Sequence, residues 1–345
     1  ASGRARASAV FGAGVPVGAA LAMFGGGAIA ATHGWRPAFW MLGLPGIMLA
    51  IALLVLVREP TRGGRDAART HAGTTSPGSG AQAGAGALAL ARRLWSNPAT
   101  RGHLLGYALF AVAANAVAMW TPSLLVARYG VDLRTVGTAL GAATLVGGLG
   151  GSALGGTFAD RMRRRGNGGR MRFAAGAALC CAAAWAALLL APSFGWAVAA
   201  LVLLCAGALV WLGPALADLA ELVDPAERGS AVGVYYLVVN LVGYGLAPPL
   251  LGLLADRAPG EQAARLGAAL VACPVVCCIA ALVLWTGAAH REGVDYRRRR
   301  LDAATASTMS GGKMPVAQRQ LFDASSTSSA ASAAASSAPS VLGGS

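Results

Sequence analysis

The sequence carries little charge for its length. Only 12% of its 345 residues are Asp, Glu, Lys or Arg, whereas a soluble domain usually has about a quarter. Hydrophobic residues make up 56%, and no ionisable side chain occurs between Thr135 and Ala159. This composition argues against a soluble domain, because water would be a poor solvent for such a surface.

Residues that could build a catalytic or metal centre are also scarce. The four histidines all lie outside the middle of the apolar runs, and no nucleophile–base pair is evident, so we expect no enzyme activity. The six cysteines lie within apolar runs; Cys273 and Cys277 stand one helical turn apart, but packing is favoured over metal binding. The glycines of Gly147–Gly156 lack the Lys-Ser/Thr of a phosphate loop, and their spacing favours close helix packing. No cofactor is expected beyond a proton or another coupling ion.

The sequence instead contains long apolar runs. A helix needs roughly 20 apolar residues to cross the hydrocarbon of a bilayer. The sequence lacks the alternating ten-residue pattern of a membrane β-barrel. We therefore predict an all-α polytopic membrane bundle whose eight helices span about 7–31, 36–57, 102–127, 135–159, 173–191, 194–217, 229–255 and 266–289.

Two segments have too few apolar residues to form a core. Residues 59–101 include a Gly-, Ser- and Thr-rich stretch that predicts a disordered linker, with a short surface helix from Leu88 to Trp95. Residues 291–345 predict a disordered tail, because Ser and Ala dominate its end.

The arginines are unevenly distributed, within a net charge of +14. When the eight helices are threaded alternately across a bilayer, 23 basic residues fall in one set of loops and 5 in the other. By the positive-inside rule, this places both termini and the linker in the cytoplasm. Because the arginines cluster between apolar runs without a nucleic-acid-binding motif, no nucleic-acid partner is expected.

Two spans begin with a similar pentapeptide. Arg6-Ala-Ser-Ala-Val10 opens the first span, and Arg228-Gly-Ser-Ala-Val232 opens the seventh. Their equivalent placement indicates parallel structural repeats. By this repeat, four further spans would precede the chain, whose eight helices would correspond to helices 5–12 of a twelve-helix, six-plus-six protein. Residues 1–58 would then hold the last two helices of the first half, and residues 102–290 the second half.

The turn after the fourth span carries a charged motif, Gly156-Thr-Phe-Ala-Asp160-Arg161-Met-Arg163-Arg164-Arg165. It resembles the cytoplasmic motif of the major facilitator superfamily, in which Gly, three residues, Asp, a basic residue, one residue, Gly and two basic residues follow each other. Arg163 stands where the family usually has glycine, which puts the shape of the turn in doubt. Residues 34–63 and 227–256 are similar to the Spinster-like branch of that superfamily.

The resemblance implies a secondary transporter of the cell membrane that moves a small organic or amphipathic solute by alternating access. It implies a monomer whose partners are the solute and the lipid bilayer. The alternative is a non-transporting or regulatory membrane fragment that packs with a partner.

The motif predicts a gate. A carboxylate is favoured near a helix N-terminus, so we expect Asp160 to approach the start of the first span, with Arg6 as its ion-pair partner. Gly156, Arg161, Arg164 and Arg165 complete the predicted gating motif, and Arg228 should lack an equivalent partner. The alternative is that the charges only fix the topology.

Polar and aromatic residues within the spans are candidates for a substrate cavity or for interhelical hydrogen bonds. His103, near a predicted helix end, is expected at the surface, and no Asp, Glu, Arg or Lys is expected in the middle of a span. The candidates that would line the cavity are Asn115, Trp120, Trp211, Tyr236, Asn240 and Tyr244.

Overall fold

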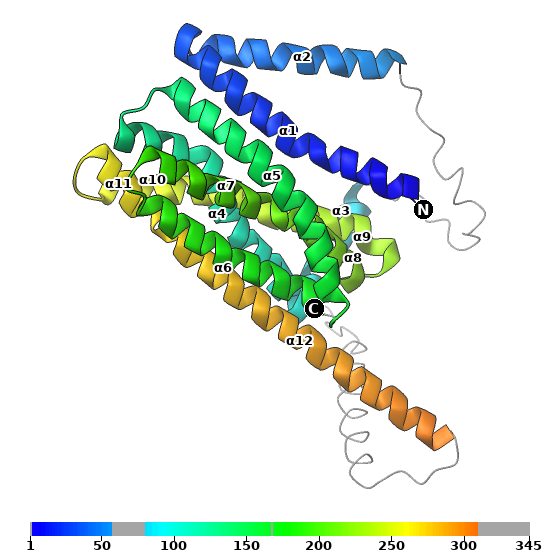
Figure 1. The fold of residues 1–345 in the computed structure, drawn as a ribbon. Coiled ribbons are helices and arrows are strands. Elements are labelled where there is room, and N and C mark those ends of the chain that lie inside the picture. Colours follow the sequence, from blue (N-terminus) through cyan, green and yellow to red (C-terminus); the bar gives the residue numbers. More distant parts are fainter. Residues whose placement is uncertain (1, 57–79, 167, 310–345) are drawn as a thin grey trace, which may run out of the picture. The chain divides into compact units, whose positions relative to one another are not determined.

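The computed structural model of the chain describes residues 2–56, 80–166 and 168–309, which are almost entirely helical (Figure 1). No strand occurs in these ranges, which confirms the all-α fold. The elements in chain order are α1 (Ser2–His33), α2 (Trp35–Leu56), α3 (Gly80–Ser96), α4 (Pro98–Tyr129), α5 (Leu133–Arg163), α6 (Gly169–Leu189), α7 (Phe194–Val210), α8 (Leu212–Leu222), the 3₁₀ turn η1 (Pro225–Glu227), α9 (Arg228–Asn240), the π-helical turn η2 (Leu241–Leu246), α10 (Ala247–Arg257), α11 (Gln262–Leu270) and α12 (Ala272–Met309).

Eight segments of this described part are long and apolar enough to cross a membrane, which confirms the predicted number. Several are longer than predicted, because hydropathy excludes the polar residues at helix ends. The sixth span, for example, continues to Leu222 rather than ending at 217. The segments are Ala13–His33, Trp35–Leu56, Pro98–Tyr129, Leu133–Arg163, Gly169–Leu189, Phe194–Leu222, Arg228–Arg257 and Gln262–Gly293.

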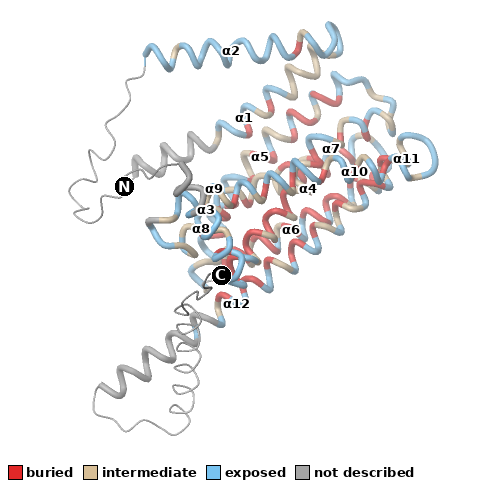
Figure 2. Tube along the Cα trace, turned by 180° about the vertical axis from the view of Figure 1, so that it is seen from behind, coloured by how far each residue is buried: buried red, intermediate tan, exposed pale blue. Residues whose placement is uncertain are grey.

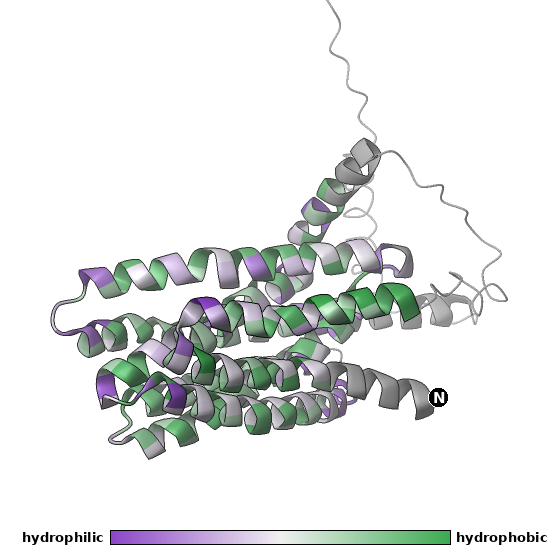
Figure 3. Ribbon diagram, turned by 90° about the horizontal axis from the view of Figure 1, so that it is seen from above, coloured by the Kyte–Doolittle hydropathy of each residue, from purple (hydrophilic) through white to green (hydrophobic). Residues whose placement is uncertain are grey.

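Local signals fix the helix ends. Asn97 caps α4, because its side-chain oxygen accepts a hydrogen bond from the Ala99 amide at 3.0 Å. Gly130 ends α4 in the left-handed conformation, with φ of 64°. Asp132 then caps α5 by accepting from the Thr135 amide at 3.3 Å. Hydrophilic residues gather mainly at such turns in Figure 3, whereas the helix bodies are mainly hydrophobic.

Two spans are interrupted. The sixth breaks at Trp211, between α7 and α8. The seventh widens into the π-helical turn η2 directly before Pro248 and Pro249. Proline has no amide hydrogen and its ring crowds the carbonyl four residues earlier, which explains the widening at this place.

Residues 1–289 form one compact unit, and residues 290–345 form a second. Within the first unit, α5 packs against α1 on one side and against α7 on another. The end of this unit that contains the turn between α5 and α6 is called the motif end here, and the opposite end the far end. Figure 2 shows the buried residues concentrated on α4, α6 and α7, where Tyr107, Met171 and Leu201 are fully buried.

Helix α2 is exposed along nearly its whole length (Figure 2). Ala38 is its one buried residue, and Leu54 is 84% exposed. A helix whose exposed side chains are apolar is suited to a hydrocarbon solvent rather than to water.

The predicted disorder of the linker and the tail is wrong in part. Residues 80–96 of the linker form α3, which contains the predicted helix from Leu88 to Trp95. Helix α3 buries Leu90 and Leu94 on one face and contacts α4 and α9, because residues four apart share a helix face. Residues 291–309 of the predicted tail belong to α12, whereas 57–79 and 310–345 lie outside the described residues.

Candidate functional site

The charged motif lies on a tight turn between α5 and α6. The amide of Arg165 donates to the Met162 carbonyl at 3.0 Å, and that of Gly169 to the Gly166 carbonyl at 3.0 Å. Arg163, which replaces the expected glycine, is the last residue of α5. The helix therefore continues through this position.

Ion pairs connect this turn to the end of α8. The Arg170 guanidinium lies 2.8 Å from Asp160 and 2.6 Å from Glu221. Arg163 Nε donates to the other Glu221 oxygen at 2.8 Å. These four side chains are called the motif network here. Its centre is shielded, because the Arg170 side chain is only 12% exposed whereas that of Asp160 is 63% exposed.

Sequence reasoning identified Asp160 but missed Arg170 and Glu221. Charged hydrogen bonds in shielded positions are stronger than exposed ion pairs, which contribute about 0–1 kcal/mol. The signal was the run of acids three residues apart at the end of the sixth span, from Asp218 to Glu227, which places carboxylates beside the basic turn.

The other motif residues have different surroundings. Arg161, Arg164 and Arg165 are exposed. A Cβ atom at Gly156 would meet nothing within 4 Å. Arg6 lies in α1, but its side chain is outside the described residues, so its predicted pairing with Asp160 stays a prediction.

Arg228, the repeat equivalent of Arg6, donates from Nε to the Ala220 carbonyl at 2.8 Å. It therefore binds the C-terminal turn of α8, where a cation is favoured.

A buried aromatic cluster lies where α4 packs against α8 and α9. His103 and Tyr107 of α4 have ring centroids 4.7 Å apart, and Tyr107 stacks on Trp211 at 5.7 Å. Tyr235 of α9 lies 5.7 Å from the His103 ring. His103 was expected at the surface, and that expectation is wrong: it is fully buried, because α8 and α9 cover this part of α4.

Asp218 is a second polar residue that is buried near a helix end. It is fully buried within the sixth candidate span, Phe194–Leu222. It lies close to the end of this span, which continues to Leu222 rather than ending at 217, so it is not one of the charges in the middle of a span that the sequence was expected to lack. Ionisable residues inside spans are costly and usually functional.

The predicted cavity residues divide into two groups. Trp211 is buried in the aromatic cluster, whereas Tyr236 and Tyr244 are 41% and 57% exposed. Asn240 is also exposed, and its amide donates to the Tyr236 carbonyl at 2.8 Å. These last three residues lie four apart along the seventh span and form a polar stripe on its surface.

Two candidates on α4 face the backbone of the seventh span. A Cβ atom at Gly243 would lie 2.8 Å from the Asn115 amide nitrogen, and one at Gly252 would lie 3.4 Å from the Trp120 ring. Asn115 thus meets the π-helical turn η2 beside the polar stripe, while Trp120 packs on α10. Asn115 and Trp120 of α4 therefore contact the span that carries the polar stripe.

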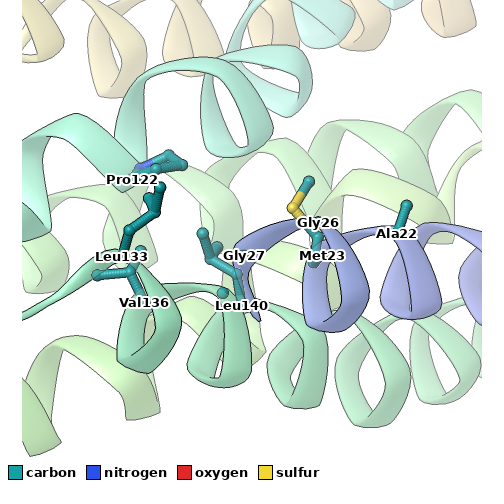
Figure 4. A pocket seen from close by; sticks show the side chains of 9 residues that line it. Ala22, Met23, Gly26, Gly27, Pro122, Leu133, Val136 and Leu140 are labelled. Atoms are coloured by element: carbon teal, nitrogen blue, oxygen red, sulfur yellow. The ribbon is translucent and has the colours of Figure 1, made fainter. Parts of the chain in front are cut away.

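A cavity of about 220 Å³ lies at the far end, between α1, α4 and α5 (Figure 4). None of the predicted cavity residues contributes to it. Its lining offers only apolar side chains and backbone: Ala22, Met23, Gly26, Gly27, Pro122, Leu133, Val136, Gly137 and Leu140. In the described ranges, no group of three or more His, Cys, Asp or Glu is arranged to hold a metal ion.

These features define a polytopic helical membrane protein with an ion-paired turn at one end of the bundle. The sequence profile of the Major Facilitator Superfamily matches residues 1–248. The chain belongs to this superfamily, and it is an integral membrane protein.

One similar protein is an efflux pump. An MFS-type efflux pump of Mycolicibacterium smegmatis is 26% identical over 262 residues, which cover 74% of this chain and 57% of that protein. The chain therefore spans a little more than half the length of this relative.

Two crystal structures share the fold. Both are of a bacterial homologue of the human lysosomal transporter Spinster in inward-facing conformations. The unoccupied form has a TM-score of 0.64 and 22% identity, over 84% of this chain and 71% of the other. The occupied form has a TM-score of 0.64 and 21% identity, over 84% and 70%. At this identity the likeness shows the fold alone.

Proposed function

We propose that this chain provides the greater part of a secondary transporter that moves a small organic or amphipathic solute by alternating access. Residues 1–58 would belong to one half of the transporter and residues 102–290 to the other, with both termini on the cytoplasmic side. The motif end would then face the cytoplasm, and the protein would lie in the cell membrane.

The motif network is the observation that carries this proposal. It joins the ends of three helices, α5, α6 and α8, through two arginines and two carboxylates. All three helices lie within the proposed half of residues 102–290, so the network fixes their ends relative to one another and holds Asp160 in place as one side of a gate. The carboxylate of Asp160 remains largely exposed and is thus available to a helix of the other half, such as the start of α1.

The far end supports the same reading. Here α1 and α5 approach so closely that a Cβ atom on Gly27 would lie 2.9 Å from the Gly137 Cα atom. In the proposed arrangement, this contact would hold the two halves together at the far end. The two structures that share the fold are both inward-facing, which is the state expected when the external side is closed.

The polar stripe supports a substrate path. Tyr236, Asn240 and Tyr244 are exposed within a membrane span, where facing lipid would leave hydrogen-bonding groups without partners. A cavity between the halves would give these groups water or solute to bind.

The test compares two carboxylates in proteoliposomes that contain the 345-residue chain, assayed with a panel of solutes. Asp160→Asn should lower the transport rate about fivefold, because an ion pair of a largely exposed carboxylate, which contributes up to about 1 kcal/mol, is lost at the gate. Asp256→Asn is the matched control, because Asp256 also pairs with an arginine, Arg265 at 3.2 Å, but lies at the far end. Its transport rate should stay within about twofold of the parent.

Equal rates in both variants and the parent would leave the motif only a role in topology. If the parent chain moves no solute in the panel, the alternative of a non-transporting membrane fragment that packs with a partner is favoured instead.

A further inference from the structure

The apolar cavity at the far end belongs neither to the motif network nor to the polar stripe. Its walls come from both proposed halves: Met23 lies on α1, Pro122 on α4 and Leu133 on α5 (Figure 4). Val136 and Leu140, which also line it, are almost completely buried. The cavity is therefore a separate feature of the place where α1 meets α4 and α5.

The cavity is poorly suited to hold water. A buried water needs about two to four hydrogen-bonding partners. The lining offers apolar side chains and helix backbone, most of whose polar groups are bonded within the helices. Atoms that border an empty space lose dispersion contacts, and an apolar occupant would restore them.

The volume and the depth of the cavity indicate what could fill it. A cavity of about 150 Å³ binds benzene, so the 220 Å³ found here has room for about eight carbon atoms. Helix α5 has 31 residues and is about 46 Å long, whereas the hydrocarbon of a bilayer is about 30 Å thick. Its first turn therefore reaches the headgroups. The stretch from Leu133 to Leu140 descends about 10 Å, to the depth at which acyl chains begin.

The rim of the cavity lies on the surface of membrane spans. Ala22 is exposed, and Leu133 is 43% exposed. They belong to the candidate spans Ala13–His33 and Leu133–Arg163, where an exposed side chain meets lipid chains rather than water. An acyl chain of the leaflet at the far end could thus enter sideways.

We propose that this cavity binds a segment of about eight carbons of a lipid acyl chain, and that the bound chain holds α1 against α5. The second part rests on the proposed function, which assigns α1 and α5 to different halves. Gly27 and Gly137, through which the two helices touch, also line the cavity. If α1 withdraws, the cavity loses a wall and the chain loses contacts. A chain that binds only the closed far end favours that state.

The first experiment maps the site by photo-crosslinking. The purified 345-residue chain is placed in phosphatidylcholine nanodiscs that contain a small fraction of a lipid with a diazirine near the top of its acyl chain. Cross-links located by mass spectrometry should be more frequent on residues 22–27 and 133–140 than on α2, which is exposed along nearly its whole length. A frequency no higher than on α2 would overturn the proposal.

Two matched variants test whether the cavity causes this enrichment. Ala22→Phe would fill the cavity with a ring, so cross-links on residues 133–140 should fall to the level of α2. Ala31→Phe adds the same ring to the same helix, at an exposed position outside the lining, and the enrichment should persist. An enrichment that is lost in both variants, or in neither, would contradict a site in the cavity.

The second experiment measures the hold on the far end and needs no change in the cavity. Distances between spin labels at Thr32 and Thr135, both exposed, report the separation of α1 and α5. Phytanoyl chains carry methyl branches that make them too wide for the cavity. In such lipids the ratio of closed to open states should fall at least about fivefold relative to straight-chain lipids with the same headgroup. Ala22→Phe should remove this dependence, and an equal ratio in both lipids would show that no chain holds α1.

The failure of this proposal can be told apart from the failure of the proposed function, because neither measurement requires transport. Enriched cross-links together with normal transport in Asp160→Asn would keep the lipid site and exclude the gate. Cross-links no more frequent than on α2, together with impaired transport in Asp160→Asn, would do the reverse.

Discussion

Helix α5 packs through glycines on two sides, and the two interfaces differ in how closely the backbones meet. Toward α7, a Cβ atom on Gly151 would lie 2.8 Å from the Ala206 Cα atom and closer still to its carbonyl oxygen. Toward α1, a Cβ atom on Gly137 would lie 2.8 Å from the Met23 carbonyl oxygen and 3.0 Å from the Gly27 Cα atom. The first interface lies within one proposed half and the second between the halves.

The difference indicates which of the two interfaces, α5–α7 or α5–α1, can separate. Gly147 and Gly155 repeat the overlap with the α7 backbone seen at Gly151, so this interface is interlocked over two turns. The contact with α1 includes side chains as well, since Gly141 lies under the Phe24 ring. A contact made partly by side chains can separate and re-form, whereas interlocked backbones favour a permanent unit.

The largest effect is expected from Gly151→Ala. The added methyl group would force α5 and α7 apart, and overpacking of this kind costs about 1–3 kcal/mol or more. We expect a lower melting temperature and a smaller folded fraction in detergent, measured by thermal unfolding monitored with circular dichroism. Unfolding at the parent temperature would show that the α5–α7 interface is not interlocked.

Gly137→Ala should act on the conformational equilibrium instead of the fold. We expect melting close to that of the parent, because α1 can withdraw from α5 without disturbing α7. A cost of about 1–3 kcal/mol for the closed contact would favour states with the far end open by about 5- to 150-fold. Distances between spin labels placed at Thr32 and Thr135, both exposed, would measure this shift; a fall in melting temperature as large as that of Gly151→Ala would contradict the comparison.

Gly150→Ala sharpens the comparison, because it adds the same methyl group to the same helix at a position where a Cβ atom meets nothing within 4 Å. Alanine favours a helix over glycine by about 0.5–1 kcal/mol. We expect a slightly raised melting temperature and an unchanged distance between the Thr32 and Thr135 labels. A loss of stability here would mean that α5 tolerates no added volume on any side.

The smallest effect is expected at the cap of α5. The hydrogen bonds from Thr135 lower the pKa of Asp132 from its ordinary value of 3.8, so the ionised form stabilises the folded state. This stabilisation is present above the unfolded pKa and is lost as the pH falls through the lower folded pKa. Asp132→Ala should therefore melt slightly below the parent at pH 7, and the gap should close below about pH 4. A gap of equal size at both pH values would exclude the charge as its cause.

The sequence predicted the spans and the charged motif because both signals are local. Apolar length determines whether a helix can cross a bilayer, and the spacing from Asp160 to Arg165 places the charges on one turn. The glycines of α5 were also assigned to packing, but their neighbours, α1 and α7, could not be read from spacing alone.

The burial of polar residues could not be predicted in the same way. His103 and Asp218 lie near helix ends, where a single sequence favours exposure. They are buried because α4, α8 and α9 cover each other there, and this depends on contacts between residues more than 100 positions apart. The pairing of Arg170 with Glu221 has the same origin, since it requires the end of the sixth span to meet the start of the fifth.

The π-helical turn of the seventh span has a consequence for its mechanics. Two successive prolines deprive the carbonyl groups of Tyr244 and Gly245 of the amide donors that an α-helix would provide. A helix is easiest to bend where such bonds are missing. The bend would let α10, which contacts Trp120, change its angle to α9. Helix α9 would stay in place, because Arg228 at its start binds the Ala220 carbonyl of α8.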